Sequence, residues 1–196
     1  AEPDEAVMDV IEAMMSETGE VIYNERKRFV EEFQPIFLDL YRRLAGNVTE
    51  EVSMSYVSHG ERGDLQSQLR DWRQRERIVG YSLHGVHKDD LDLTLNGFAV
   101  KREASQGQQK TYFIAMKLAQ YVFLKNKGEK MVPLLLLDDI FDKLDSNRVE
   151  QIINYVSGNE FGQIFITDTR REHLDQVLAA TQRDYKLFVV ENGGVK

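Results

Sequence analysis

The sequence predicts an α/β protein in which helices flank a mainly parallel sheet, with a mostly helical segment ahead of it. Three observations support this fold class. Apolar residues recur at helical spacing over residues 7–44. Beyond residue 100, helical segments alternate with short apolar runs, as in parallel α/β sheets. Between these regions, Asn96-Gly97 joins two strand-like runs and indicates a β-hairpin.

The composition changes near residue 79, so we expect a helical arm over residues 1–78 and a lobe over residues 79–196. The arm opens with one long helix or two, for which Gly19 and Pro35 are the weak points. Gly46-Asn47 ends this helix as a C-cap would. A strand and a helix follow, at residues 52–57 and 64–78.

In the lobe, the hairpin strands occupy residues 91–95 and 98–100. The remaining elements alternate between helix and strand, and the expected ranges are 108–125, 133–137, 147–156, 163–167, 171–180 and 185–190. Each strand run is apolar and each helix has an apolar face. This order predicts a sheet with helices packed on its faces.

Composition limits the compartment and the ligands. The chain has no cysteine, which excludes disulfides and thiolate metal sites and fits a reducing compartment, so we expect a cytoplasmic protein. The run of four leucines at residues 134–137 is far too short to span a membrane. A net charge of −8 argues against a surface that binds nucleic acid everywhere. One arginine cluster is either a local DNA-binding patch or a solvated helix face: Arg62, Arg70, Arg73, Arg75 and Arg77.

Four leucines, Leu134 to Leu137, lead directly into Asp138 and Asp139. Such a run predicts a central strand that is buried on both faces, with two carboxylates at the edge where parallel sheets bind ligands. In a nucleotide-hydrolysing site, Asp138 would hold Mg²⁺ through its waters and Asp139 would orient the attacking water. The alternative is a strand end followed by an acidic turn.

The segment Ser105-Gln106-Gly107-Gln108-Gln109 comes immediately before an apolar-periodic helix. Ser105 could simply cap that helix. A hydroxyl, a glycine and free N–H groups at a helix N-terminus can equally bind a phosphate. Ser105 lies 33 positions before Asp138, with a helix between them, and this spacing favours the phosphate interpretation.

Together these two segments resemble the signature loop and the Walker B strand of ABC-type P-loop ATPase heads. The segment Phe141-Asp142-Lys143-Leu144-Asp145 resembles their D-loop. More specifically, residues 104–111 are similar to the signature of the RecF family of SMC/ABC-type ATPases. Residues 84–91 resemble a further stretch of that family, Gly-Pro-His-Arg-Asp-Asp-Leu, from which Val86 and Lys88 depart.

The resemblance implies the C-terminal lobe of a head that dimerises when it binds ATP and Mg²⁺. Ser105 and Gly107 would contact the γ-phosphate held by the other subunit, and Leu144 and Asp145 would lie at the same interface. It also implies binding to double-stranded or gapped DNA and to recombination mediator proteins. Many ABC heads have a histidine after the next strand, where this chain has Asp168. An anion cannot replace that donor to the γ-phosphate, whereas Thr167 or Thr169 could.

The phosphate-cradling motif GxxxxGK[ST] is not in the sequence, since no glycine is followed by lysine. We therefore expect the chain to be part of a longer ATPase and to hydrolyse little or no ATP by itself. Two alternatives stay open. One is the nucleotide-binding subunit of a membrane transporter, whose usual Leu-Ser-Gly-Gly-Gln signature and Walker B glutamate this chain lacks. The other is a non-enzymatic interaction module.

Overall fold

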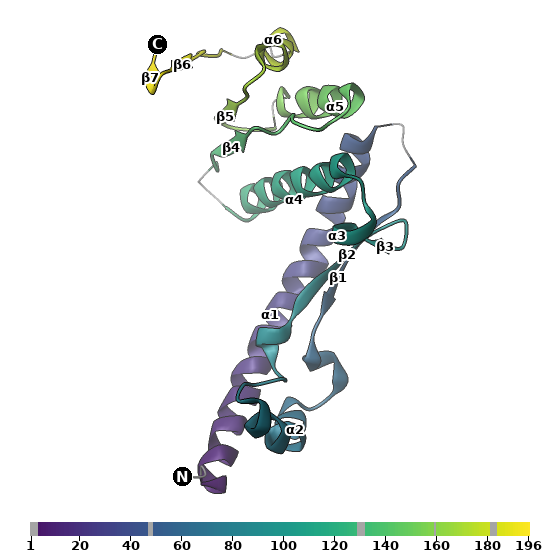
Figure 1. Ribbon diagram of the computed structural model, residues 1–196, viewed down its shortest axis with the longest axis vertical. Coiled ribbons are helices and arrows are strands. Elements are labelled where there is room, and N and C mark those ends of the chain that lie inside the picture. The colour runs from purple at the N-terminus through teal and green to yellow at the C-terminus, as the bar shows by residue number, and fades with distance from the viewer. Residues whose placement is uncertain (1–3, 47–48, 129–131, 159, 181–183) are drawn as a thin grey trace. The chain divides into compact units, whose positions relative to one another are not determined.

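The computed structural model describes residues 4–46, 49–128, 132–158, 160–180 and 184–196. The chain folds into two compact units (Figure 1). The first unit comprises residues 1–38 and 50–104, and the second comprises residues 39–49 and 105–196. Helix α1 (Glu5–Ala45) is continuous and contributes to both.

Helix α1 passes through both of its predicted weak points. Pro35 lies inside the helix. Gly19 allows Leu65 of the first unit to pack closely against the helix. A Cβ at position 19 would lie only 2.7 Å from Cδ2 of Leu65. The helix ends at Ala45, and Gly46 follows with a φ of +67°, the left-handed conformation of a helix C-cap. Asn47, the other half of the predicted cap, lies outside the described residues.

The first unit contains an antiparallel sheet of three strands. Strand β1 (Val52–Val57) pairs with β2 (Asp90–Leu95), and β2 pairs with β3 (Phe98–Ala99). Asn96 and Gly97 have φ of +51° and +79°, as a two-residue turn of this handedness requires, so the hairpin prediction is confirmed. Because β2 pairs with β1, the hairpin belongs to the first unit. The predicted division at residue 79 between arm and head stays a prediction.

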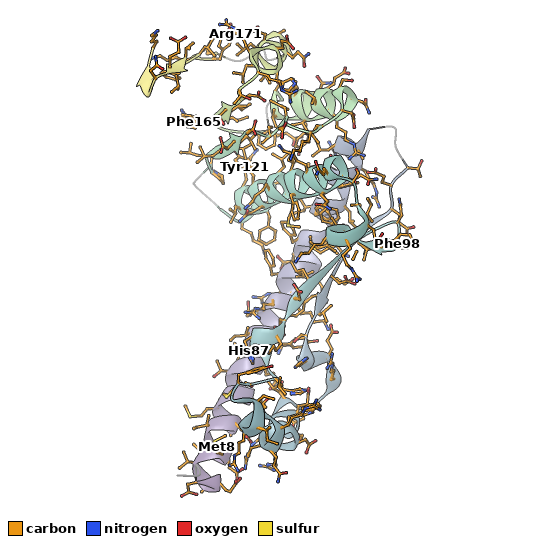
Figure 2. All side chains as sticks on the ribbon, in the orientation of Figure 1. Met8, His87, Phe98, Tyr121, Phe165 and Arg171 are labelled. Carbon is orange, nitrogen blue, oxygen red and sulfur yellow. The ribbon has the colours of Figure 1, made fainter. Side chains whose placement is uncertain are left out.

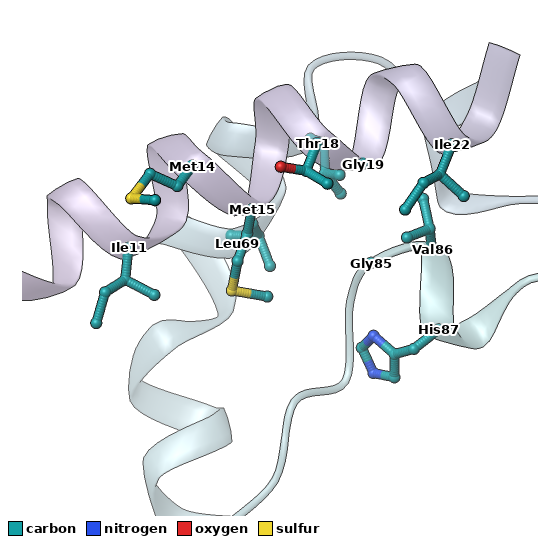
Figure 3. A pocket seen from close by; sticks show the side chains of 11 residues that line it. Ile11, Met14, Met15, Thr18, Gly19, Ile22, Leu69, Gly85, Val86 and His87 are labelled. Atoms are coloured by element: carbon teal, nitrogen blue, oxygen red, sulfur yellow. The ribbon is translucent and has the colours of Figure 1, made fainter.

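Helix α2 (Leu65–Val79) packs in the first unit through Leu65, Leu69 and Arg73. Asp64 caps its N-terminus by accepting a hydrogen bond from Ser67 N at 2.7 Å. The side chains of α1 and α2 border an apolar pocket of about 460 Å³ (Figure 3). Three shorter helices complete this unit: η1 (His59–Arg62), η2 (Val86–Lys88) and α3 (Val100–Glu103).

The second unit is built on a parallel pair of strands. Strand β4 (Leu135–Asp138) pairs with β5 (Ile164–Thr167), and the register places Asp138 beside Thr167. The helices of this unit are α4 (Gln106–Lys127), α5 (Ser146–Val156) and α6 (Arg171–Ala180). Its buried side chains include Tyr41, Tyr112, Leu118, Phe141, Ile152 and Phe161. Helices packed with a parallel sheet confirm the predicted α/β class.

Two sequence expectations in this unit were wrong. Strand β4 is covered on one face only, because Leu135 and Leu137 are buried whereas Leu136 is 71% exposed. Phe165 on β5 is also exposed (Figure 2). The strand expected over residues 185–190 does not form; residues 184–189 are irregular.

A short hairpin takes the place of that predicted strand. Strand β6 (Val190–Glu191) pairs antiparallel with β7 (Gly194–Val195). Asn192 and Gly193 both have positive φ, so the chain reverses immediately after Glu191. Along the part of the chain that the structure describes, no helix is long and apolar enough to cross a membrane.

Candidate functional site

The predicted signature residues occupy the N-terminus of α4. Ser105 is the N-cap: its Oγ accepts a hydrogen bond from Gln108 N at 3.2 Å, and its own N–H donates to Gln108 Oε1 at 2.8 Å. The capping interpretation is therefore correct. It is compatible with phosphate binding, because a hydroxyl that accepts at the cap keeps its own proton to donate. Ser105 and Gln106 are both exposed.

Gly107 brings the start of α4 close to the loop between β4 and α5. A Cβ on Gly107 would lie 3.2 Å from the carbonyl oxygen of Lys143. A larger residue here would push helix and loop apart. Gln108 and Gln109 follow on the first turn, where both are partly exposed.

The two predicted catalytic carboxylates lie at the end of β4. The Thr167 hydroxyl donates a hydrogen bond to Asp138 Oδ1. Asp139 has a φ of +45°, unusual for a residue other than glycine, and its N–H donates to Thr167 O at 3.1 Å. Lys110 of α4 donates from Nζ to Asp139 O at 2.6 Å. Both aspartates are exposed at the edge predicted for ligand binding.

The predicted D-loop residues lead into α5. Asp145 caps this helix, since its Oδ1 accepts from Arg148 N at 2.9 Å. Leu144 N donates to Phe141 O at 3.4 Å, which closes a tight turn in the loop. The structure thus brings the start of α4, the end of β4 and the start of α5 together within one unit.

At the position where the resemblance to ABC heads predicts a histidine, the chain has a buried aspartate, Asp168, beside a histidine of α6. The Asp168 side chain is 1% exposed, and its Oδ2 lies 3.1 Å from Nδ1 of His173 on α6. The His173 ring packs edge-on against the Phe141 ring, with 5.3 Å between the ring centroids. The contact between His173 and Asp168, five positions apart, was not predicted from the sequence.

Three further residues were missed because their roles depend on tertiary contacts: Lys110, Thr111 and Arg148. Thr167 was considered only in place of the histidine, and its hydrogen bond to Asp138 was not predicted. The only local signals were the i, i+4 spacing of Gly107 and Thr111 and the i, i+3 spacing of Asp145 and Arg148. Among the described residues, no group of three or more histidine, aspartate or glutamate side chains is arranged to hold a metal ion. Asp138 could contribute one ligand, or hold Mg²⁺ through its waters, with the rest supplied by nucleotide and water.

The predicted arginine patch lies in the first unit, on and near α2. Arg73 is buried, contrary to the solvated-face interpretation, and its guanidinium donates to Glu12 and Asp9 of α1. These hydrogen bonds, first those to Glu12, raise the pKa of Arg73. Arg77 also pairs with α1, through Glu5 at 2.6 Å.

The other arginines of the patch are more exposed. Arg70 is 3.9 Å from Asp9, and its side chain is 58% exposed. The Arg75 guanidinium stacks over the Trp72 ring at 4.9 Å. Arg62 lies at the end of η1 and is also exposed.

The segment from His84 to Leu91 packs inside the first unit. Glu76 accepts hydrogen bonds from the N–H groups of Leu83 and His84, at 2.6 and 3.0 Å. Burial alone would raise the pKa of Asp89, but hydrogen bonds from Ser58, Tyr56 and Arg26 outweigh it and hold that pKa below its usual value. These hydrogen bonds hold the segment between α2 and β2 against α2 at one end and against α1 and β1 at the other.

Comparison with known proteins gives one consistent result. The DNA replication and repair protein RecF of Phocaeicola vulgatus is 53% identical over 192 residues, which are 98% of this chain and 52% of that protein. RecF of Parabacteroides distasonis is 50% identical over 193 residues, again 98% of this chain and 52% of the relative. The chain thus spans about half the length of the curated relatives it matches. No family model matches it.

Solved structures agree on the fold. A structure described as the recombination mediator protein RecF with ATPrS in the RecFOR pathway superposes with a TM-score of 0.72 at 20% identity. The match covers 98% of this chain and 51% of that one. A second structure, described as RecF with ATP, gives a TM-score of 0.67 and covers 86% of this chain and 46% of that one.

Proposed function

The chain is homologous to RecF over 98% of its length, and from this premise we propose that it is the C-terminal half of a RecF-type ATPase. The whole protein binds ATP, dimerises through its heads and binds double-stranded or gapped DNA during recombinational repair in the bacterial cytoplasm. Its partners include recombination mediator proteins. The two sequence relatives named above are both DNA replication and repair proteins, which favours this function over a transporter subunit or a non-enzymatic module.

One observation carries the proposal. The capped N-terminus of α4, with Ser105 exposed, lies beside the loop that follows Asp138 and Asp139, and Gly107 permits the close approach. An exposed hydroxyl at a helix N-terminus suits a phosphate, and carboxylates at a parallel-strand edge suit a nucleotide-bound cation. One unit therefore carries both a phosphate-binding element and a cation-binding element, and in the dimer the two would serve different nucleotides.

The residues divide the work in the following way. Asp138 would hold Mg²⁺ through its waters, and the hydrogen bond from Thr167 orients its carboxylate. Asp139 orients the water that attacks the phosphate. When bound, Mg²⁺ neutralises the charge on the phosphate oxygens. Ser105 and Gly107 face the nucleotide held by a second copy, and the D-loop residues Leu144 and Asp145 lie at the same dimer interface.

This arrangement needs the rest of the protein. No GxxxxGK[ST] motif exists among these 196 residues, so the α- and β-phosphates have no cradle here. We propose that the other half, present in the relatives, supplies it. The 196-residue chain alone then hydrolyses little or no ATP, and measurable turnover that Asp139→Asn abolishes would contradict this proposal.

Substitution of Ser105 tests the trans-acting signature in the full-length protein. Ser105→Arg is expected to leave binding of a fluorescent ATP analogue intact and to abolish ATP-dependent dimerisation, measured by sedimentation velocity. Gln120→Arg is the matched control, because it adds the same charge on an exposed position of the same helix. Dimerisation of Ser105→Arg on ATP would show that this residue does not act in trans.

A further inference from the structure

Thr111 links the first turn of α4 to a residue outside that helix. The side chain is fully buried, and its Oγ1 donates a hydrogen bond to Gly107 O at 2.9 Å. The same oxygen accepts a hydrogen bond from Nη1 of Arg148 at 3.0 Å. The hydroxyl therefore uses both its donor and its acceptor capacity inside the unit.

Arg148 extends this link to the D-loop. It lies in the first turn of α5, and its side chain is only 7% exposed. Its Nε lies 3.2 Å from Oδ2 of Asp145, and its N–H donates to Oδ1 of the same carboxylate. A buried guanidinium is costly to desolvate, so each of these partners matters for its position.

These contacts form one continuous polar chain, Gly107–Thr111–Arg148–Asp145. It joins the signature glycine to the D-loop aspartate through two buried side chains. The backbone approach of Gly107 to Lys143 runs parallel to it. A displacement of one segment therefore changes the hydrogen bonding that reaches the other, because the side chains of Thr111 and Arg148 that link them are buried.

We propose that Arg148 is a positioning residue that couples the start of α4 to the D-loop through Thr111. Ser105 and Asp145, at the two ends, are then set in their dimer-competent positions together. This inference rests on the proposed function, in which both segments meet the second copy. The inference explains why Ser105 and Asp145 of one copy are positioned together.

Substitutions of Thr111 test the coupling in the full-length protein. Thr111→Val keeps the shape and removes the hydroxyl, whereas Thr111→Ser keeps the hydroxyl. We expect Thr111→Val to weaken ATP-dependent dimerisation by about 5- to 150-fold, the usual range of coupling between sites. The affinity of each copy for the ATP analogue should change by less than about twofold, well below the change in dimerisation. Thr111→Ser should restore dimerisation.

Two further variants keep the inference open to refutation if Thr111→Val folds poorly. Arg148→Lys keeps a positive charge, but an ammonium group cannot contact Thr111 and Asp145 at the same time with the planar geometry of a guanidinium. Asp145→Asn keeps the helix cap and removes only the ion pair. Both should weaken dimerisation at a temperature well below the melting point of each variant, with nucleotide affinity retained. Full dimerisation of both variants would overturn the inference.

The outcome separates this inference from the proposed function. If Ser105→Arg abolishes dimerisation and the Thr111 and Arg148 variants dimerise normally, only the coupling is wrong. If Ser105→Arg also dimerises normally, the trans-acting signature itself is wrong. Variants that lose thermal stability without a change in dimerisation would assign the chain of contacts a purely structural role.

Discussion

The Glu12 carboxylate accepts two hydrogen bonds from the Arg73 guanidinium, from Nε at 2.7 Å and from Nη2 at 2.6 Å. Both residues are buried, although Arg73 stood in the sequence as one of five arginines on an apparently solvated face. Asp9 and Glu5 complete the set of carboxylates around it. An arginine held in this way ties α2 to the first turns of α1.

Removal of the Arg73 side chain should destabilise the first unit. Arg73→Ala leaves Glu12 buried without its partner, and we expect the melting temperature to fall by about 5–10 °C. Fluorescence of Trp72, the single tryptophan, reports on this unit. Arg62→Ala, at an exposed arginine, is the control and should shift the transition little. Equal shifts in the two variants would contradict a buried anchoring role.

The same geometry narrows the DNA-binding prediction to the exposed arginines. Arg75→Ala in the full-length protein should weaken DNA binding and reduce the slope of log affinity against log salt by about 1. The measurement is fluorescence anisotropy with a gapped duplex at several salt concentrations. An affinity that does not depend on salt, or a slope unchanged by Arg75→Ala, would exclude this patch as a phosphate contact.

Asp139 should be needed for hydrolysis and not for nucleotide binding. In the full-length protein we expect Asp139→Asn to bind ATP and dimerise while hydrolysis falls about 100-fold or more, since the neutral amide orients and polarises the attacking water less well than the carboxylate does. Phosphate release measures this. Asp142→Asn is the control, because Asp142 lies in the same loop and is paired only loosely, 4.0 Å from Arg170. Comparable losses in both variants would point to loop disruption.

The first unit should lose stability in mildly acidic solution because of His59. Burial is the main cause that lowers the pKa of this imidazole, and the positive charge of Arg62 and the neighbouring His84 and His87 add to it, against the opposing charge of Asp89. In the unfolded chain His59 takes up a proton near pH 6.5. The folded unit resists this, so the free energy of unfolding should fall as pH drops below about 6.5 and level off below the folded pKa.

Denaturant titrations between pH 7.5 and 5, followed by Trp72 fluorescence, measure this dependence. His59→Gln should flatten it, because the amide does not titrate in this range. His87→Gln, at an exposed histidine, should leave it in place. A pH dependence that survives His59→Gln unchanged would assign the effect to another group.

Local chemistry accounts for most of what the sequence predicted correctly. The periodic apolar positions of α1, α4 and α5 predicted helices, and Asn96-Gly97 predicted the hairpin because both positions need positive φ. The cap at Ser105 and the acidic end of β4 were likewise predicted, since both depend on residues that are close together in the chain. The strand predicted at residues 185–190 failed because apolar alternation alone does not supply a pairing partner.

The sequence by itself therefore determined the α/β class, the positions of most helices and strands, and the Ser105 and Asp138-Asp139 segments. Only the tertiary structure decided that Arg73 is buried against Glu12, that Leu136 stays exposed and that Arg148 reaches Thr111. Each of these depends on which faces of separate elements meet. Spacing along the chain carries local periodicity, whereas burial and long-range hydrogen bonds are set by packing between segments that lie far apart in sequence.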